Sequence, residues 1–179
     1  EKFFPYKRDK KTLARDWALP GTAGLEHRIG GLEKADGTGN VCYEPDNHHH
    51  MVELRQQKID IIANFIPDVE SYGKDNGELL ILGWGGTYGA IRAAVEKAMN
   101  NNLSVSHIHL KHINPLPKNL GEALLKYNKV LIPEINLGQL SSIIRNKYLI
   151  DTLNYNRVSG KPFTTSDIYS KILEILEGK

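Results

Sequence analysis

The chain has 179 residues, a few tens more than a typical single domain, so we expect one compact core with a long extension. Apolar residues make up 40% of the sequence, and no apolar run approaches the ~20 residues of a membrane helix. Disordered, collagen-like and membrane-spanning chains are thereby excluded. The net charge of +2, from 23 Lys and Arg against 21 Asp and Glu, is too balanced for binding nucleic acid or an anionic membrane.

Cys42 is the only cysteine, so the chain cannot form an intramolecular disulfide or ligate an iron–sulfur cluster by itself. We therefore expect a soluble protein of the reducing cytoplasm. The first five residues contain no initiator Met and lack the layout of a signal peptide. This start predicts a segment cut from within a longer protein.

The N-terminal third of the sequence lacks regular periodicity. Residues 1–47 follow neither a helical nor a strand period and are interrupted by six glycines, so we expect an irregular segment that wraps around something else. A helix is predicted from about His48 to Ile66, capped by Asp46 and ended by Pro67. Its predicted apolar face holds Met51, Leu54, Ile61, Ile62 and Phe65. Residues 68–77 have the composition of a polar linker.

From Glu78 onward, apolar strands alternate with helices. The predicted strands are Glu78–Trp84, Ser104–Lys111, Lys129–Glu134 and about 151–155. The predicted helices are Thr87–Asn101, one after Pro117 carrying Leu120, Leu124 and Tyr127, one opening at Asn136 with a layout close to a capping box, and about Thr165–Leu176. This alternation predicts an α/β fold, a three-layer α/β/α domain with a mostly parallel sheet. Because Pro133 lacks a ladder donor, we expect a bulge or the strand's end there.

A glycine-rich turn, Gly83 to Gly89, lies where the first of these strands gives way to a helix. Its backbone at Gly85, Gly86 and Thr87 could hold an anion, whereas the alternative, which the weak spacing favours, is close packing of helix on sheet. No acidic residue ends the next strand, which disfavours NAD. Further along, Glu134 and Asn136 follow a strand and could face a ligand. A carboxylate serving the next helix's N-terminus is an equally open interpretation of Glu134.

Seven histidines offer few metal-binding arrangements. His107 and His109 share one face of a strand, but no carboxylate or thiolate is nearby to complete a metal site, so packed and hydrogen-bonded histidines are favoured. The run His48–His50 points in three directions on a helix, and we expect it to be solvated or to face another subunit. We also find no Ser-His-Asp order and no P-loop lysine. The sequence thus predicts no catalytic residues and no metal ligands.

Several stretches, taken in order, resemble the alpha subunit of 2-oxoacid:ferredoxin oxidoreductases, particularly the 2-oxoglutarate type. They are Pro20-Gly21-Thr22 through Gly24 into Leu25-Glu26-His27, the spaced set His48, Met51, Val52, Arg55 and Lys58, then Leu82 to Thr87, Ile113 to Pro117, and Pro133 to Leu140. The resemblance covers nearly the whole chain.

The resemblance implies a part of a thiamine-dependent enzyme that oxidatively decarboxylates a 2-oxoacid to an acyl-CoA and reduces ferredoxin. It implies that residues 1–67 are the tail of a preceding domain, that 68–77 are a linker and that 78–179 are similar to the transketolase C-terminal domain. Thiamine diphosphate, magnesium and the iron–sulfur cluster would lie on other parts of the complex, with no cofactor on this segment. The implied partners are the thiamine-binding beta subunit and the N-terminal part of the same chain, with ferredoxin and coenzyme A at the level of the complex.

Two functional hypotheses follow. The first is a domain for subunit assembly and the active-site rim, inert alone. The second is a small-anion or coenzyme A binding module that uses the turn at 83–89 and the edge at Glu134. Because a detached domain exposes apolar surface, we also expect a homodimer at high concentration.

Overall fold

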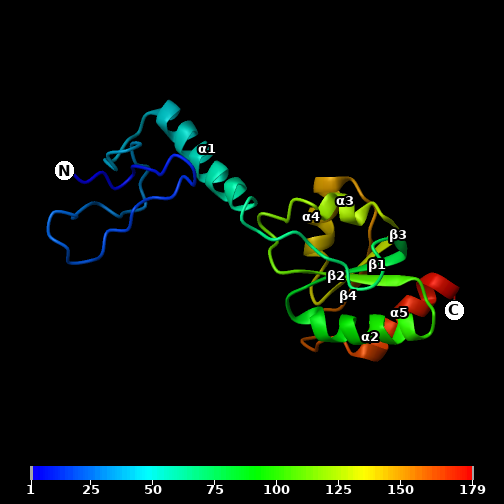
Figure 1. Cartoon of the computed structure of the whole chain (residues 1–179). Helices are drawn as coiled ribbons and strands as arrows, with labels where there is room; N and C mark the ends of the chain where they lie inside the picture. Colours follow the sequence, from blue (N-terminus) through cyan, green and yellow to red (C-terminus); the bar gives the residue numbers. More distant parts are fainter. Residues whose placement is uncertain (1, 179) are drawn as a thin grey trace. The chain divides into compact units, whose positions relative to one another are not determined.

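The computed structural model describes residues 2–178, and the chain divides after Ile66 into two compact units (Figure 1). We call residues 2–66 the N-terminal unit and residues 67–178 the C-terminal unit, and describe each by itself. None of the described helices is long and apolar enough to cross a membrane.

The N-terminal unit is irregular chain apart from helix α1, Pro45–Ile62. The irregular part is tied by three isolated antiparallel bridges, which join Tyr6 to Gly37, Arg8 to Arg15 and Lys34 to Val41. The start predicted at about His48 is wrong by three residues and the predicted cap Asp46 by two: Glu44 is the cap and Pro45 opens the helix, because the fixed φ of proline suits the first helical position. The helix also ends four residues before Ile66, where the amide of Phe65 bonds the carbonyl of Ile62 in a tighter turn.

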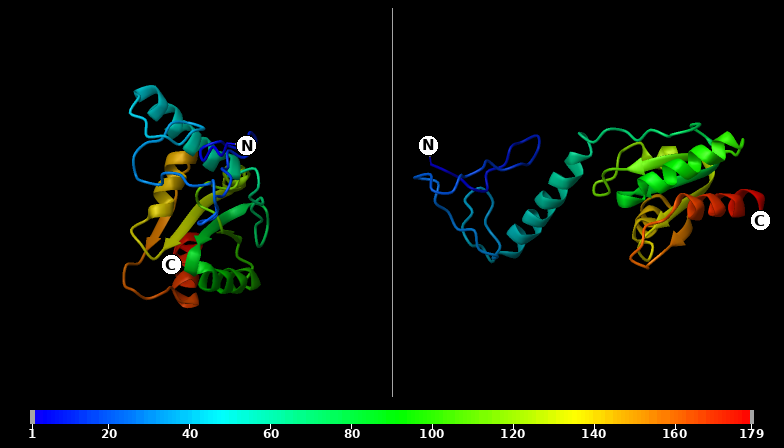
Figure 2. Two further views of the ribbon diagram at one scale, coloured as in Figure 1. Left: turned by 90° about the vertical axis from the view of Figure 1, so that its left-hand side faces the viewer. Right: turned by 90° about the horizontal axis from the view of Figure 1, so that it is seen from below.

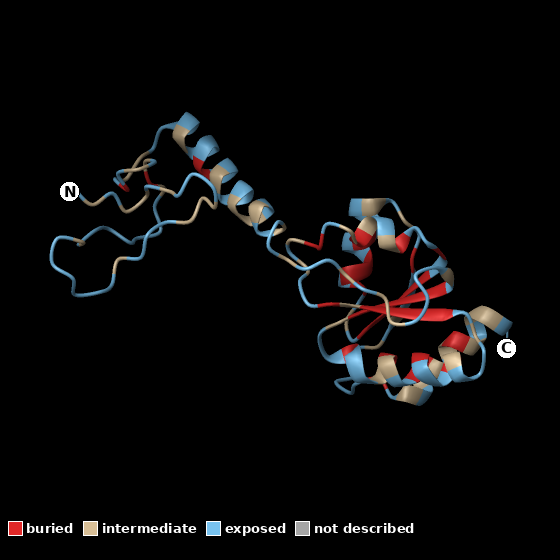
Figure 3. Ribbon diagram, viewed as in Figure 1, coloured by how far each residue is buried: buried red, intermediate tan, exposed pale blue. Residues whose placement is uncertain are grey.

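Burial in the N-terminal unit is sparse (Figure 3). Met51 is the one apolar side chain among residues 2–66 that is buried, and Phe65 of the predicted apolar face is 73% exposed. The other buried side chain is Lys34, whose ammonium donates to the carbonyls of Gly30, at 2.7 Å, and Leu32. Hydrogen bonds, rather than an apolar core, therefore organise this unit.

The C-terminal unit is built on a four-stranded sheet whose strands are all parallel, in the order β2-β1-β3-β4. The strands are β1 Gly77–Trp84, β2 Val105–Leu110, β3 Tyr127–Glu134 and β4 Leu153–Asn156. In the register, Ile81 of β1 lies beside His107 on one side and Leu131 on the other. The predicted α/β class with a parallel sheet is confirmed.

Helices cover both faces of this sheet (Figure 2). They are the 3-10 turn η1 Gly85–Thr87, α2 Tyr88–Asn100, α3 Leu120–Leu124, α4 Gln139–Tyr148 and α5 Thr165–Glu177. On one face α2 and α5 bury Ile91, Val95, Ile168 and Ile172 against Leu79, Ile81 and Leu131. On the other, α3 and α4 bury Leu120, Leu124, Leu140 and Ile144 against Leu80, Leu82 and Ile132. Two apolar layers thus sandwich the sheet, as the continuous apolar runs of β1 and β3 predict.

The helix predicted after Pro117 is much shorter than its apolar spacing suggests. It spans only Leu120–Leu124, and Tyr127 belongs to β3, where its hydroxyl donates to the carbonyl of Lys74 at 2.6 Å. Tertiary contacts override the helical spacing here. From its place in a strand, Tyr127 packs in the same core as Leu120 and Leu124, as it would from a helix.

The segment predicted as a linker, 68–77, is held on the C-terminal unit. The side chain of Asn119 bonds both the amide and the carbonyl of Val69, each at 2.9 Å, and Tyr72 exchanges two backbone hydrogen bonds with His107. Because β2 is an edge strand, this pairing covers its free side. The expectation of a bulge or the strand's end at Pro133 is met only in part. The β1–β3 ladder ends at Leu131, but β3 continues to Glu134, and Pro133 pairs with Tyr155 of β4.

Candidate functional site

The fold places a topological switch point between β1 and β3. From β1 the chain enters α2 on one face, and from β3 it enters α4 on the other, so the carboxyl ends of these strands flank the crevice where ligands of open α/β sheets usually bind. Here the crevice is bridged by the last residues of both strands. The indole Nε1 of Trp84 donates to Oε1 of Glu134 at 3.2 Å.

Glu134 is fully buried, and both of its oxygens are occupied by hydrogen bonds from the chain. Besides the indole of Trp84, the amides of Leu140 and Ser141 donate to it at 2.8 and 3.1 Å, and Asn136 Nδ2 donates at 3.2 Å. These amides are unsatisfied donors at the start of α4, so Glu134 acts as the carboxylate at that helix N-terminus. This geometry supports the structural interpretation of Glu134.

Asn136 completes the same cap. Its Oδ1 accepts from the amides of Gly138 and Gln139 at 2.8 and 2.9 Å. Gly138 adopts φ +94°, a left-handed conformation that glycine adopts without strain. The predicted capping-box layout at Asn136 is thus replaced by an arrangement in which two side chains from before the helix cap it.

The glycine-rich turn separates into two parts. Gly83 is needed for packing, since a Cβ there would lie 2.7 Å from Cδ1 of Ile91 on α2. Gly85, at φ +57°, and Gly86 face open space. The buried hydroxyl of Thr87 donates to the carbonyl of Trp84 at 2.8 Å, so it shapes the turn from within. Of the candidate residues Gly85, Gly86 and Thr87, the two glycines leave the turn accessible.

His107 and His109 lie side by side on the face of β2 that α2 covers. Tyr88 of α2 contacts both rings, with centroids 5.7 and 5.0 Å away. His107 is only 2% exposed, and neither its Nε2 nor Nδ1 of His109 has a hydrogen-bond partner among the described residues. Burial, followed by the charges of His109 and Arg92, lowers the pKa of His107 to about 3, so the ring is neutral at pH 7. The sequence predicts packed histidines here, but not their missing hydrogen bonds.

These histidines form one wall of a cavity of about 440 Å³ in the C-terminal unit. Its other polar residues come from separate parts of the chain. The guanidinium of Arg92 lies 2.9 Å from the centroid of the Tyr72 ring, and Lys111 and His112 follow β2. A basic residue on α2 and one just after the histidine strand are the signals that could have indicated this site.

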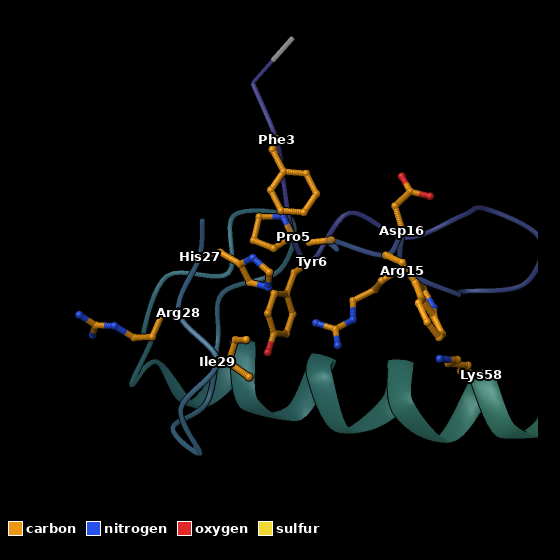
Figure 4. Close-up of a pocket in the computed structure, with 11 residues that line it drawn as sticks. Phe3, Pro5, Tyr6, Arg15, Asp16, His27, Arg28, Ile29 and Lys58 are labelled. Atoms are coloured by element: carbon orange, nitrogen blue, oxygen red, sulfur yellow. The ribbon is translucent and has the colours of Figure 1, made fainter. Parts of the chain in front are cut away.

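A second cavity, of about 340 Å³, lies in the N-terminal unit (Figure 4). Aromatic and basic side chains line it, and the guanidinium of Arg15 lies 4.3 Å from the centroid of the Tyr6 ring. Trp17 and Ile29 form part of its wall and are 90% and 83% exposed. The cavity is therefore a hollow in a largely uncovered apolar surface.

The histidine run of α1 makes contacts within the N-terminal unit. His48 bonds Glu33 at 2.7 Å, and His50 bonds Asp36 at 3.1 Å. The side chains of all three histidines of the run, 48–50, remain largely exposed. Among residues 2–178, no group of three or more His, Cys, Asp or Glu side chains is placed to hold a metal ion.

Comparison with known proteins gives a consistent set of relatives, although no family model matches the sequence. The chain is 49% identical, over its whole length, to the 2-oxoglutarate oxidoreductase subunit KorA of Mycobacterium tuberculosis, of which it covers 27%. It is 27% identical over 80% of its length to a 2-oxoacid:ferredoxin oxidoreductase subunit alpha of Aeropyrum pernix, of which it covers 24%.

A solved structure is similar over nearly the whole chain. It is 2-oxoglutarate:ferredoxin oxidoreductase from Magnetococcus marinus, with 2-oxoglutarate, coenzyme A and succinyl-CoA bound, and it matches 98% of this chain with a TM-score of 0.87 and 28% identity. The match covers 31% of that protein's chain. The chain therefore spans about a quarter to a third of the length of these relatives.

Proposed function

We propose that this chain, which is similar along its length to part of a 2-oxoglutarate oxidoreductase subunit, is an assembly and active-site-rim segment of a 2-oxoacid:ferredoxin oxidoreductase alpha subunit. The whole enzyme would oxidatively decarboxylate a 2-oxoacid, form an acyl-CoA and pass electrons to ferredoxin. The 49% identity to a subunit named for 2-oxoglutarate supports that acid as the substrate.

One observation carries the assembly role. Among the described residues, the N-terminal unit buries a single apolar side chain, Met51, while Trp17, Leu19, Ile29, Leu32 and Phe65 are exposed. Exposed apolar side chains in such number are typical of surfaces that another chain or domain covers. We assign that cover to the rest of the alpha subunit and to a thiamine-binding beta subunit.

The proposal gives this segment no catalytic step. Its one cysteine cannot supply the four thiolates of an iron–sulfur cluster. Thiamine diphosphate, magnesium and the cluster would accordingly lie on other parts of the complex. The Glu134 cap and the Trp84 bridge would keep the sheet edge rigid where it meets the active site.

The first test is the light-scattering mass of the chain mixed with the purified thiamine-binding subunit. A stable complex is expected, together with 2-oxoglutarate-dependent dye reduction only when the rest of the alpha subunit is also supplied. Replacing two exposed residues, Trp17→Ser with Ile29→Ser, should abolish the complex, whereas the matched control Val158→Ser, exposed on the C-terminal unit, should not. Dye reduction by the chain alone would contradict the proposal.

The same uncovered surface supports self-association when partners are absent. Sedimentation of the isolated chain should show a homodimer at millimolar concentration, and the double variant should shift it to monomer. A wild-type chain that stays monomeric would contradict this part of the proposal.

A second candidate function is a small-anion or coenzyme A binding module at the turn Gly85–Thr87. The open space above Gly85 and Gly86, at the start of α2, favours it. Calorimetric titration of the chain with coenzyme A should then give micromolar binding that Gly86→Glu abolishes and the control Gly31→Glu, which also faces open space, does not. A flat titration of the wild-type chain would refute it.

A further inference from the structure

We propose that the cavity lined by His107, His109 and Arg92 is a binding site for a small dianionic oxyanion, either a phosphate group or a dicarboxylate. The site lies wholly within the C-terminal unit and is separate from the turn at Gly85–Thr87. The inference does not depend on the assembly role, because it concerns only contacts inside this unit.

Two histidines in the wall of this cavity each have a ring nitrogen without a hydrogen-bond partner. Nε2 of His107 and Nδ1 of His109 are both buried without a hydrogen bond, and each lies 3.2 Å from the point where a Cβ on Gly83 would be. An unsatisfied buried polar atom costs about 1–3 kcal/mol, so a fold that keeps two of them side by side gains when a ligand accepts from both. Both nitrogens therefore lie beside Gly83, where a Cβ would also be 2.7 Å from Cδ1 of Ile91.

The wall of the cavity also contains basic side chains. Arg92 from α2 and Lys111 at the end of β2 line the same cavity, and the Tyr72 ring holds the guanidinium of Arg92 in place. Guanidinium and ammonium groups beside neutral imidazole N–H donors make a set of donors that suits a phosphate or carboxylate.

Two neighbouring histidines on a strand could suggest a metal site. The positive charges of Arg92 and Lys111 disfavour a metal ion in this cavity. Burial, followed by the charges of His109 and Arg92, lowers the pKa of His107, and burial followed by the charge of Lys111 lowers that of His109. Groups that oppose a proton on these rings also repel a divalent cation and attract an anion. Three charged side chains of the cavity lining, Lys111, Asp68 and Glu70, are exposed and screened by solvent, whereas Arg92 is half-buried and its charge is screened less.

The anion and the histidine protons should be linked. Free His107 has a pKa of about 3 because it is buried and faces positive charge from Arg92, and a bound dianion would favour its protonated form. The other groups that line the cavity are Lys111, His112, Tyr72, Tyr88, Asp68 and Glu70. Affinity for sulfate, which stays a dianion across this range, should therefore rise about twofold as the pH falls from 6 to 4.

The test is a titration of the full 179-residue chain, followed through the imidazole nitrogen resonances in nuclear magnetic resonance spectra. The probes are inorganic phosphate, 2-oxoglutarate, sulfate and zinc, each at constant ionic strength in a zwitterionic buffer. Saturable shifts of the His107 and His109 resonances are expected with phosphate, with 2-oxoglutarate or with both, and the stronger ligand identifies the source. With sulfate, the pKa of His107 should rise by about one unit.

Variants separate this site from general salt effects. Arg92→Gln and Lys111→Gln should each weaken anion binding by about tenfold through loss of a charged donor. The matched control is Lys97→Gln, on the same helix, whose ammonium lies 4.2 Å from the centroid of the Tyr169 ring and does not line the cavity. The proposal is overturned if wild-type shifts do not saturate, if Arg92→Gln and Lys111→Gln bind like Lys97→Gln, or if only zinc binds.

Discussion

The two units of this chain are held together by different forces. In the C-terminal unit, two layers of apolar side chains enclose a parallel sheet. In the described part of the N-terminal unit, the only buried side chains are those of Met51 and of Lys34, whose ammonium donates to backbone carbonyls. Burial of apolar area is the dominant favourable term in folding. The C-terminal unit therefore carries its own stability, whereas the stability of the N-terminal unit depends on what covers it. Each unit holds one tryptophan, Trp17 or Trp84, which lets the comparison be tested in a single chain.

The largest contrast is expected in backbone protection. Amide hydrogen exchange of the isolated chain should be about 10⁴-fold slower in β1 and β3 than in residues 2–44, because the former open only with global unfolding. Mass spectrometry of peptides after timed exchange measures this. Equal protection in both regions would refute the comparison, whereas added partner subunit should slow exchange in the N-terminal unit alone.

Core truncation should separate the units next. Leu80→Ala should lower the free energy of unfolding of the C-terminal unit by about 2–5 kcal/mol through loss of burial and a residual cavity. Urea unfolding followed by Trp84 fluorescence in a Trp17→Phe background is the measurement. The control Met51→Ala, equally buried but outside both cores, should leave this transition unchanged. A shared shift would mean that the units unfold together.

The Glu134 cap should matter less than the core but more than a surface charge. Glu134→Gln replaces one of two accepting oxygens with a donor that faces an amide, and should cost about 1–3 kcal/mol. It should also shift Trp84 emission, since the indole donates to this carboxylate. The exposed Glu96→Gln on α2 is the control and should change neither. An unchanged stability of Glu134→Gln would remove its capping role.

Acid should weaken the C-terminal unit through His107. The pKa of this ring in the fold, about 3, lies below the ordinary 6.5, so the unfolded chain binds the extra proton and stability falls as the pH drops from 6.5 to 3. In His107→Phe this slope should flatten, whereas in the exposed His112→Gln it should persist. Thermal unfolding in anion-poor buffers between pH 7 and 4 checks the difference.

The smallest effect is expected at Glu33 in the N-terminal unit. Hydrogen bonds from Arg55 and His48 lower its pKa from 4.5 to about 2, so ionised Glu33 stabilises the unit above pH 4.5 and that contribution is lost as the pH falls toward 2. The pair with Arg55 is partly exposed, and such pairs contribute little. Glu33→Gln should therefore cause only a slight rise in exchange of α1 amides at pH 6 and no added loss below pH 2. A large change at pH 6 would contradict this.

Local sequence predicted the C-terminal unit well because its elements have strong periodicity. The apolar runs of β1 and β3 and the helical spacing of Ile91, Ala94, Val95 and Ala98 gave the correct elements within one or two residues. The element predicted least well was α3, where Tyr127 suits a helix by spacing but pairs in β3. Short apolar runs are ambiguous in this way until their partners are known.

The candidate site was predicted less completely. The sequence predicts Glu134 and Asn136 as polar residues at a strand end. That they cap α4 depends on where this helix begins. His107 and His109 were identified as sharing a strand face, but Arg92 and Tyr72 reach them from other elements. Spacing along one element gives no information about such contacts.

The sequence by itself determined the parallel α/β class, the succession of strands and helices along the chain, and the irregular character of residues 2–44, because these depend on local periodicity and on where glycine and proline interrupt it. Only the tertiary structure decided that the Glu134 carboxylate is buried and occupied, that segment 68–77 covers the edge of β2, and that two histidine nitrogens lie unpartnered beside Arg92. Burial and hydrogen-bond partnership are properties of contacts between distant residues, and the fold alone brings these residues together.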